Sequence, residues 1–277
     1  IYQWAEENVK KFNSNKFEQL SYGQVDNVSI ESYKNPSGED IKRSDVVKDL
    51  GVIANGNITF KEHIDSVVTS SRIKIGILLR TFQTRERDLM LKLFNTYIRG
   101  RLEYCCPVWS PSEKAQGEIN EIERIQKSFT NRIRGMERLN YHQRLKELEL
   151  YSLKRRRERY LIILAWQMIE GIKENTLNLK ISRNRSRRIW MPIIRWSKSG
   201  KNIKHSLRTK AHNSTVSRIA RLFNKLPQNL RMMTGVTVET FKKSLDVWLK
   251  GVPDTPKIDN YPCSAETNSI VDQVVTQ

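Results

Sequence analysis

The stretch from residue 60 to residue 171 consists of successive amphipathic segments, and this pattern limits the fold more than any other feature. Apolar residues recur there at helical spacing, and the segments carry their own start and stop signals. Asn140 and Ser152 each stand before such a segment at the position of an N-cap, and Gly171 follows the last one. Helices of this kind bury one face against a neighbour, so the sequence predicts a mainly α fold.

The expected helices are short and closely spaced. Ser110, Pro111 and Glu113 form a typical N-terminal signature, with a capping Ser, a Pro in the first turn and a Glu three residues on. We therefore expect a helix to begin there and to stop at Gly135. The full set of expected helices comprises residues 60–82, 85–104, 110–135, 141–148, 152–170, 216–226 and 238–249.

The region before residue 57 favours extended structure. Residues 17–22 are a short strand candidate, and two further extended runs cover residues 28–33 and 46–53. The turn-forming cluster at residues 35–38 lies between these two runs. Two extended runs around a Pro and Gly turn predict a small N-terminal β-hairpin.

The two ends of the chain have different expected structures. Residues 1–12 look like the end of a helix with three apolar anchors, Trp4, Val9 and Phe12. The tail at residues 251–277 contains three prolines and polar ends, and we expect it to be disordered. The sequence thus predicts four parts, at residues 1–56, 57–171, 172–250 and 251–277.

Positive charge is concentrated in the third of these parts. The chain has 49 Lys and Arg against 30 Asp and Glu, a net charge of +19. Residues 175–238 contain 15 of the basic residues and no acidic one. Such a field attracts polyanions, and the resulting binding weakens as salt is added. We expect this part of the chain to be partly irregular and to bind nucleic acid.

Several classes of protein are disfavoured by the composition. The apolar runs are far shorter than the roughly 20 residues that cross a bilayer, so we expect no membrane partner. The start resembles no signal peptide, and without an initiator Met it is expected to lie inside a longer reading frame. Three Cys make a disulfide framework improbable, and none has zinc spacing. We expect an intracellular protein, in the nucleus or the cytoplasm.

Two groups of residues are candidates for nucleic-acid contact. On the expected helix 152–170, Arg155, Arg156 and Arg159 can share one face and contact phosphates. The alternative is that they form a solvated helix face. Basic and aromatic residues also alternate near residue 190, where Trp can stack on exposed bases. The alternative there is that both Trp anchor an irregular arm. The candidates are Lys154, Arg155, Arg156, Arg159, Arg183, Arg185, Arg187, Arg188, Trp190 and Trp196.

Several different short motifs follow one another in a specific order between Trp4 and Tyr261. They are Trp4 with Phe12-Asn13 and Lys16, Asp49-Leu50-Gly51-Val52 with Phe60 and His63-Ile64, Leu102-Glu103-Tyr104, Val108-Trp109-Ser110-Pro111, Arg155-Arg156-Arg157 with Arg159, Phe223-Asn224 with Leu226-Pro227, and Phe241-Lys242 with Leu245. Together and in this order they resemble the C-terminal part of reverse transcriptases from non-LTR retrotransposons of the LINE and jockey-like class.

The resemblance implies a remnant of the palm at residues 1–56 and a helical, thumb-like bundle at residues 57–171. It implies RNA, an RNA/DNA hybrid or DNA as partner, together with the missing palm and fingers of the same polyprotein. A complete polymerase of the family uses Mg²⁺ held by paired carboxylates. This sequence has no Asp-Asp pair and no candidate catalytic residue, so we expect no cofactor and no polymerisation by this chain alone. The alternative is a host-retained or decayed helical module that binds nucleic acid or protein without polymerase activity.

Overall fold

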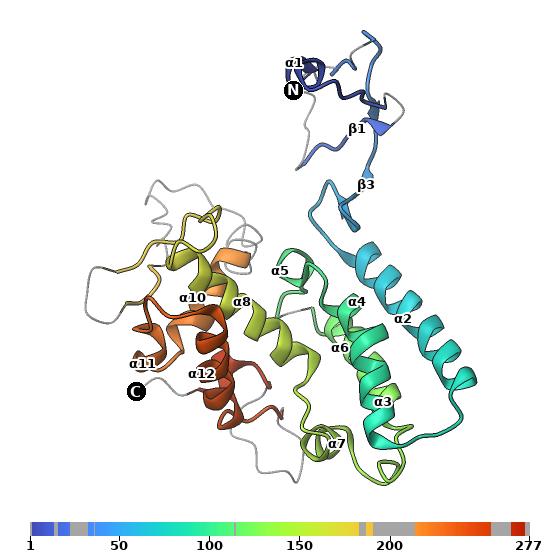
Figure 1. Ribbon diagram of the computed structural model, residues 1–277, viewed down its shortest axis with the longest axis vertical. Coiled ribbons are helices and arrows are strands. Elements are labelled where there is room, and N and C mark those ends of the chain that lie inside the picture. The colour runs from blue at the N-terminus through green and yellow to red at the C-terminus, as the bar shows by residue number, and fades with distance from the viewer. Residues whose placement is uncertain are drawn as a thin grey trace, which may run out of the picture. The chain divides into compact units, whose positions relative to one another are not determined.

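The computed structural model describes residues 2–13, 16–22, 33–35, 37–113, 115–182, 187–190, 214–255 and 267–274. The chain divides into two compact units, Ile1–Thr69 and Ser70–Gln277. Helices dominate the described residues, with two small two-stranded sheets near the N-terminus (Figure 1). The predicted fold class, mainly α with a small N-terminal β-hairpin, is confirmed.

The hairpin of the first unit forms at a different place from the one predicted. Its strands are β3 (Val46–Asp49) and β4 (Val52–Asn55), which pair antiparallel. Leu50 and Gly51 join them with φ angles of 43° and 87°. Two left-handed residues make the tight turn whose twist matches that of the flanking strands. The run at residues 46–53, predicted as one strand, therefore turns back on itself.

The other elements of this unit are short. β1 (Glu18–Gln19) pairs in parallel with β2 (Lys42–Arg43), which confirms the short strand predicted near residue 18. The predicted turn at residues 35–38 is closed by a single bridge between Lys34 and Asp40. The other half of the hairpin predicted there, residues 28–32, lies outside the described residues.

The predicted N-terminal anchors are wrong. Helix α1 (Tyr2–Glu7) buries Ala5, whereas the side chains of Trp4, Val9 and Phe12 are exposed. The reason is that α1 ends at Glu7 and Val9 takes a positive φ of 52°, so the three apolar residues do not share one helical stripe.

Helix α2 (Lys61–Thr81) contains the division between the two units. The second unit continues with α3 (Arg87–Leu93), the π-helical turn η2 (Phe94–Arg99), α4 (Gly100–Glu103), α5 (Cys106–Trp109), α6 (Gln116–Thr130), α7 (Tyr141–Glu147) and α8 (Leu153–Ile169). Its later helices are α10 (Thr215–Asn224), α11 (Gln228–Arg231), α12 (Val238–Lys250) and α13 (Ile270–Gln273).

The predicted helix starts at residues 140 and 152 are confirmed. The Asn140 side chain accepts a hydrogen bond from the Gln143 backbone N–H, and the Gln143 side chain accepts one from the Asn140 N–H. This reciprocal pair is a capping box before α7. Ser152 Oγ accepts from the Arg155 N–H, 3.0 Å away, at the start of α8. Gly171 ends this stretch with a φ of 71°.

The start predicted at Ser110 is wrong. Helix α6 begins at Gln116, and Ser110 and Pro111 lie in the irregular segment that follows α5. The Ser110 carbonyl accepts a hydrogen bond from Arg218 of α10, so a distant contact determines the backbone there. The same prediction placed Ile133 in the helix, but α6 ends at Thr130.

Helix α8 is the centre of the second unit. It packs against α5 and α6 and also against α10 and α12 (Figure 1). Trp166 stacks on Phe241 of α12, with ring centroids 4.4 Å apart. The surrounding core includes Phe223, Leu245 and Ile270, which have no exposed surface. A helix with neighbours on opposite sides must bury most of its length, including positions that carry charge.

Part of the predicted disordered tail belongs to this core. Residues 251–255 and 267–274 are ordered, and Ile270 of α13 is fully buried. The prediction of disorder is therefore wrong for these residues. The Ile270 side chain packs into the core, and the proline content of the tail did not reveal this contact. The remaining tail residues lie outside the described part of the chain.

Candidate nucleic-acid interface

The first turns of α8 bury the basic residues that were predicted to contact phosphate. Arg155 has 0% exposure and Lys154 only 7%. The Arg155 guanidinium donates from Nη1 to the Val252 carbonyl at 3.0 Å and from Nη2 to Pro253 at 2.7 Å. A third bond runs from Nη2 to the Asn268 carbonyl at 3.0 Å. Arg155 thus ties the C-terminal tail to α8 and presents no surface to a phosphate.

Arg156 and Arg159 have acidic partners on other helices. Arg156 forms a two-point ion pair with Glu103 of α4, and Tyr160 Oη donates to the same carboxylate at 2.9 Å. Arg159 contacts Asp246 of α12 through two hydrogen bonds of 2.5 and 2.7 Å. Two-point pairs of this kind fix orientation as well as charge.

These contacts correct the interpretation of the basic helix. The face predicted either as a phosphate-binding ridge or as a solvated surface is instead a set of bridges from α8 to α4, α12 and the tail. A phosphate contact at Arg156 or Arg159 would require one of these ion pairs to open. A surface that contacts phosphate without opening an ion pair would have to consist of basic residues that are exposed.

Arg187 is also occupied within the fold. Its guanidinium pairs with Glu170 and donates to the carbonyls of Arg231 and Met233 at 2.9 and 3.1 Å. Arg183, Arg185 and Trp196 lie outside the described residues. Arg188 and Trp190 therefore remain as the described candidates of the second group.

Arg188 and Trp190 lie on a short antiparallel ribbon. Ile181 forms a bridge with Ile189, and the Trp190 N–H donates to the Lys180 carbonyl at 2.7 Å. The Ser182 N–H donates to the Arg188 carbonyl at 2.8 Å. Because side chains alternate along extended backbone, the residues on either side of buried Ile189 face outward.

The outward face combines cations with an aromatic ring. Lys180 and Arg188 are exposed, and neither pairs with an acidic side chain among the described residues. The Trp190 side chain is 52% exposed, which is high for so large a ring. We call this surface the basic–aromatic ribbon, defined by its outward residues Lys180, Arg188 and Trp190.

Asn224 of α10 holds the ribbon on the helical core. Its side chain accepts a hydrogen bond from the Ile189 N–H at 2.8 Å and donates to the Ile189 carbonyl at 2.9 Å. The backbone between Arg188 and Trp190 is therefore fixed by side-chain contacts to a regular helix. This support presents the two side chains in a defined orientation.

The electrostatics around the ribbon favour an anion. The pKa of Arg231 is lowered by burial and then by the positive charge of Arg188. Guanidinium groups bind phosphate oxygens at two points, and an exposed indole can stack on a base. Lys180 was not among the sequence-predicted contacts. The alternation of residues 180–182 and 188–190 around two isoleucines was the signal that could have found it.

In the described part of the chain, no three His, Cys, Asp or Glu side chains gather as a metal-binding group. Burial raises the pKa of Cys106 to about 12, which disfavours a nucleophilic thiolate. None of the helices in the described ranges has the length and apolar character needed to span a membrane.

Comparison with known proteins gives a single partial similarity to report. The chain is 33% identical over 76 residues to the uncharacterized protein B0403.1 of Caenorhabditis elegans. The match covers 27% of this chain and 38% of that protein, so the chain spans about two fifths of its relative's length. No protein-family model and no solved structure matches the chain.

Proposed function

We propose that this chain is a nucleic-acid-binding segment of a non-LTR retrotransposon reverse transcriptase, and that the basic–aromatic ribbon makes the contact. The observation that carries the proposal is the exposure of Arg188 and Trp190 side by side on a supported ribbon. The ribbon belongs to the acid-free segment of 15 basic residues, whose field draws a polyanion to it. The assignment to this family is supported by the ordered set of short motifs from Trp4 to Tyr261 that resembles it.

In this proposal each outward residue has its own task. Arg188 and Lys180 neutralise backbone phosphates, and each such contact adds to the salt dependence of binding. The indole of Trp190 stacks on an unpaired base, a contact worth about 1–3 kcal/mol without regard to sequence. The helices behind the ribbon serve as a rigid support and do no chemistry. RNA-directed DNA polymerase activity would belong only to a complete enzyme that supplies the palm carboxylates.

The test measures binding of a fluorescent RNA–DNA hybrid, single-stranded RNA and duplex DNA across a salt series. The salt slope is the change in log affinity with log salt concentration. Arg188→Ala is expected to lower it by about the amount that one phosphate contact contributes. Trp190→Ala is expected to weaken the binding of single-stranded RNA by about 5- to 150-fold and to leave the salt slope unchanged.

Matched controls are present in the same chain. Trp4 is 56% exposed, close to the 52% of Trp190, so Trp4→Ala controls for the loss of a half-exposed indole. Arg138 is exposed and has no partner among the described residues, so Arg138→Ala controls for the loss of one positive charge. If the two ribbon variants bind as their controls do, the ribbon is not the interface.

Comparing the binding of the three nucleic acids distinguishes a polymerase segment from a module with no role in polymerisation. A preference for the hybrid supports a thumb that holds primer and template. Equal binding of all three nucleic acids supports the alternative, a helical module that binds nucleic acid without a role in polymerisation.

A further inference from the structure

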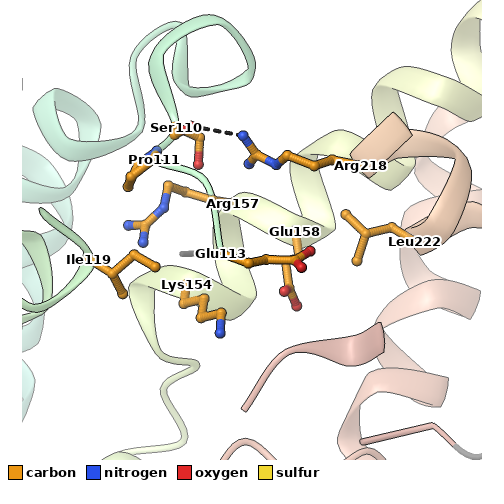
Figure 2. A pocket seen from close by; sticks show the side chains of 9 residues that line it. All are labelled: Ser110, Pro111, Glu113, Ile119, Lys154, Arg157, Glu158, Arg218 and Leu222. Carbon is orange, nitrogen blue, oxygen red and sulfur yellow. Dashed lines mark hydrogen bonds between the residues drawn. The ribbon is translucent and has the colours of Figure 1, made fainter. Parts of the chain in front are cut away.

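A small pocket lies where four parts of the second unit meet. The segment after α5 supplies Ser110 and Glu113, α6 supplies Ile119, α8 supplies Lys154, Arg157 and Glu158, and α10 supplies Arg218 (Figure 2). Its volume is about 20 Å³. A cavity needs about 10–15 Å³ to hold one water molecule, so this pocket has room for a single atom of that size.

Arg157 is the most unusual residue on the wall of this pocket. The side chain is 3% exposed, and the structure gives its guanidinium no hydrogen bond to any described residue. Its Nη1 atom is fully covered without a partner in the described ranges. A buried guanidinium offers five donors and ordinarily has them satisfied, because an unpaired buried charge is costly. Burial accordingly lowers the pKa of Arg157.

Two further cations share the wall. Lys154 is 7% exposed, and no described residue accepts a hydrogen bond from its ammonium group. Arg218 is also buried, and its Nη1 donates to the Ser110 carbonyl at 2.8 Å (Figure 2). Three positively charged side chains from two helices therefore line a space of single-atom size.

The carboxylates on the wall are committed to other partners. Glu158 accepts from Ser269 Oγ at 2.6 Å and from the Ile270 N–H at 2.9 Å. Glu113 is partly exposed and pairs with Arg221 at 3.2 Å. Among the described residues, neither carboxylate accepts a hydrogen bond from the Arg157 guanidinium or the Lys154 ammonium group.

Outside the pocket wall, Glu123 interacts electrostatically with Arg157. Its carboxylate accepts from Tyr141 Oη and from the Leu153 and Lys154 N–H groups. Burial raises the pKa of Glu123 and of Glu158, and the charge of Arg157 acts in the opposite direction on Glu123.

We propose that this pocket binds one monatomic anion, chloride being the first to test. A monatomic anion fits the volume, carries a charge opposite to that of the two buried cations, and can accept hydrogen bonds from Arg157 and Lys154. A water molecule would fit as well, but it would bring no negative charge to these two cations. The bound anion joins the segment after α5 to α8 and α10, so its binding stabilises the folded second unit by mass action. This inference does not depend on the proposed function.

The experiment compares the melting temperature in sodium chloride, sodium bromide and sodium gluconate at one ionic strength. Gluconate is too large for the pocket, so it reports the effect of ionic strength alone. We expect a saturable rise of the melting temperature with chloride and with bromide. Arg157→Met should abolish the rise, and Arg138→Met, which removes an exposed charge, should retain it.

Equal melting temperatures in chloride and gluconate would overturn the proposal, as would the same chloride response in both variants. Because a substitution at a buried position such as Arg157→Met can prevent folding, the wild-type chain is also crystallised with bromide. Anomalous scattering should then place one bromide beside the Arg157 guanidinium. A pocket without that signal contradicts the assignment.

Discussion

Arg159 of α8 and Asp246 of α12 form a two-point ion pair, although 87 residues separate them in the sequence. Arg156 and Glu103 form a second pair across 53 residues. The first pair joins α8 to α12, which packs against it, and the second joins α8 to α4. Ion pairs therefore attach this basic part of α8 to other helices, as apolar contacts do elsewhere in the core.

The Arg156–Glu103 pair predicts a large cost for neutralising one partner. Glu103→Gln removes the negative charge and leaves Arg156, whose side chain is 19% exposed, beside a neutral amide. Breaking a fully buried pair costs about 3–5 kcal/mol and an exposed pair about 0–1 kcal/mol, so we expect the free energy of unfolding to fall by about 2–3 kcal/mol. Urea denaturation followed by circular dichroism measures this loss.

The control is an exposed pair of the same type. Glu86 and Arg134 form an ion pair in which both side chains are more than half exposed. Solvent screens such a pair, so Glu86→Gln should change the free energy of unfolding by about 0–1 kcal/mol. Equal effects of the two substitutions would contradict the structural role given to Glu103.

Arg155 predicts a change that separates stability from binding. Arg155→Met removes three hydrogen bonds to carbonyls of the tail, of which only the one on Val252 belongs to a buried residue. A loss of about 1–3 kcal/mol is expected, which is the cost of one unsatisfied buried group. Limited proteolysis should cut the tail after residue 250 faster than in the wild-type chain.

The salt slope of nucleic-acid binding should not change in the same variant, because Arg155 has no surface to offer a phosphate. A lower salt slope with unchanged stability would show that Arg155 contacts nucleic acid. Arg138→Met again provides the matched control for charge.

The stacked pair of Trp166 and Phe241 predicts the sensitivity of the core. Phe241→Ala removes the ring that lies 4.4 Å from the Trp166 ring and leaves a cavity, at a cost of about 3–5 kcal/mol. Val247 lies on the same helix and is exposed, so Val247→Ala should stay within about 0.5 kcal/mol of wild type. Thermal unfolding of the two variants side by side measures the difference. Similar values would mean that α12 does not pack on α8 as described.

Local sequence signals predicted the parts of this fold that local contacts determine. Asn140 and Ser152 cap their helices through side chains that bond to residues three positions on, within reach of a sequence pattern. The turn at Leu50 and Gly51 was also local, but Leu in a left-handed conformation is rare enough that the pair was taken for part of a strand.

Distant contacts determined what the sequence could not predict. Ser110 has the residues of a helix start, yet Arg218 fixes its carbonyl in an irregular segment from 108 residues away. The partners of Arg155, Arg156 and Arg159 are 53 or more residues distant. A run of basic residues looks the same whether it faces solvent or acidic side chains on other helices. The candidate interface was accordingly predicted in part: Arg188 and Trp190 were named, but Lys180 was missed.

His63 of the first unit predicts how the hairpin responds to pH. Its Nδ1 accepts a hydrogen bond from the Ile53 N–H of β4 at 3.3 Å, and burial, followed by the charge of Lys48, lowers its pKa below the usual 6.5. Between the lowered pKa and 6.5 the folded state binds fewer protons than the unfolded state. Stability therefore rises with pH through that window, is complete above 6.5, and is lost as the pH falls through it.

Nuclear magnetic resonance can follow this at a single site. The His63 ring should titrate with a midpoint below 6.5, and exchange protection of the Ile53 amide, corrected for its intrinsic rate, should fall over the same range. His63→Leu should remove the pH dependence of that protection, because no imidazole remains to be protonated. His142 also has a lowered pKa but belongs to the second unit, so an amide of β4 reports on His63 alone. A midpoint at or above 6.5 would show that the Nδ1 atom of His63 does not hold the hairpin.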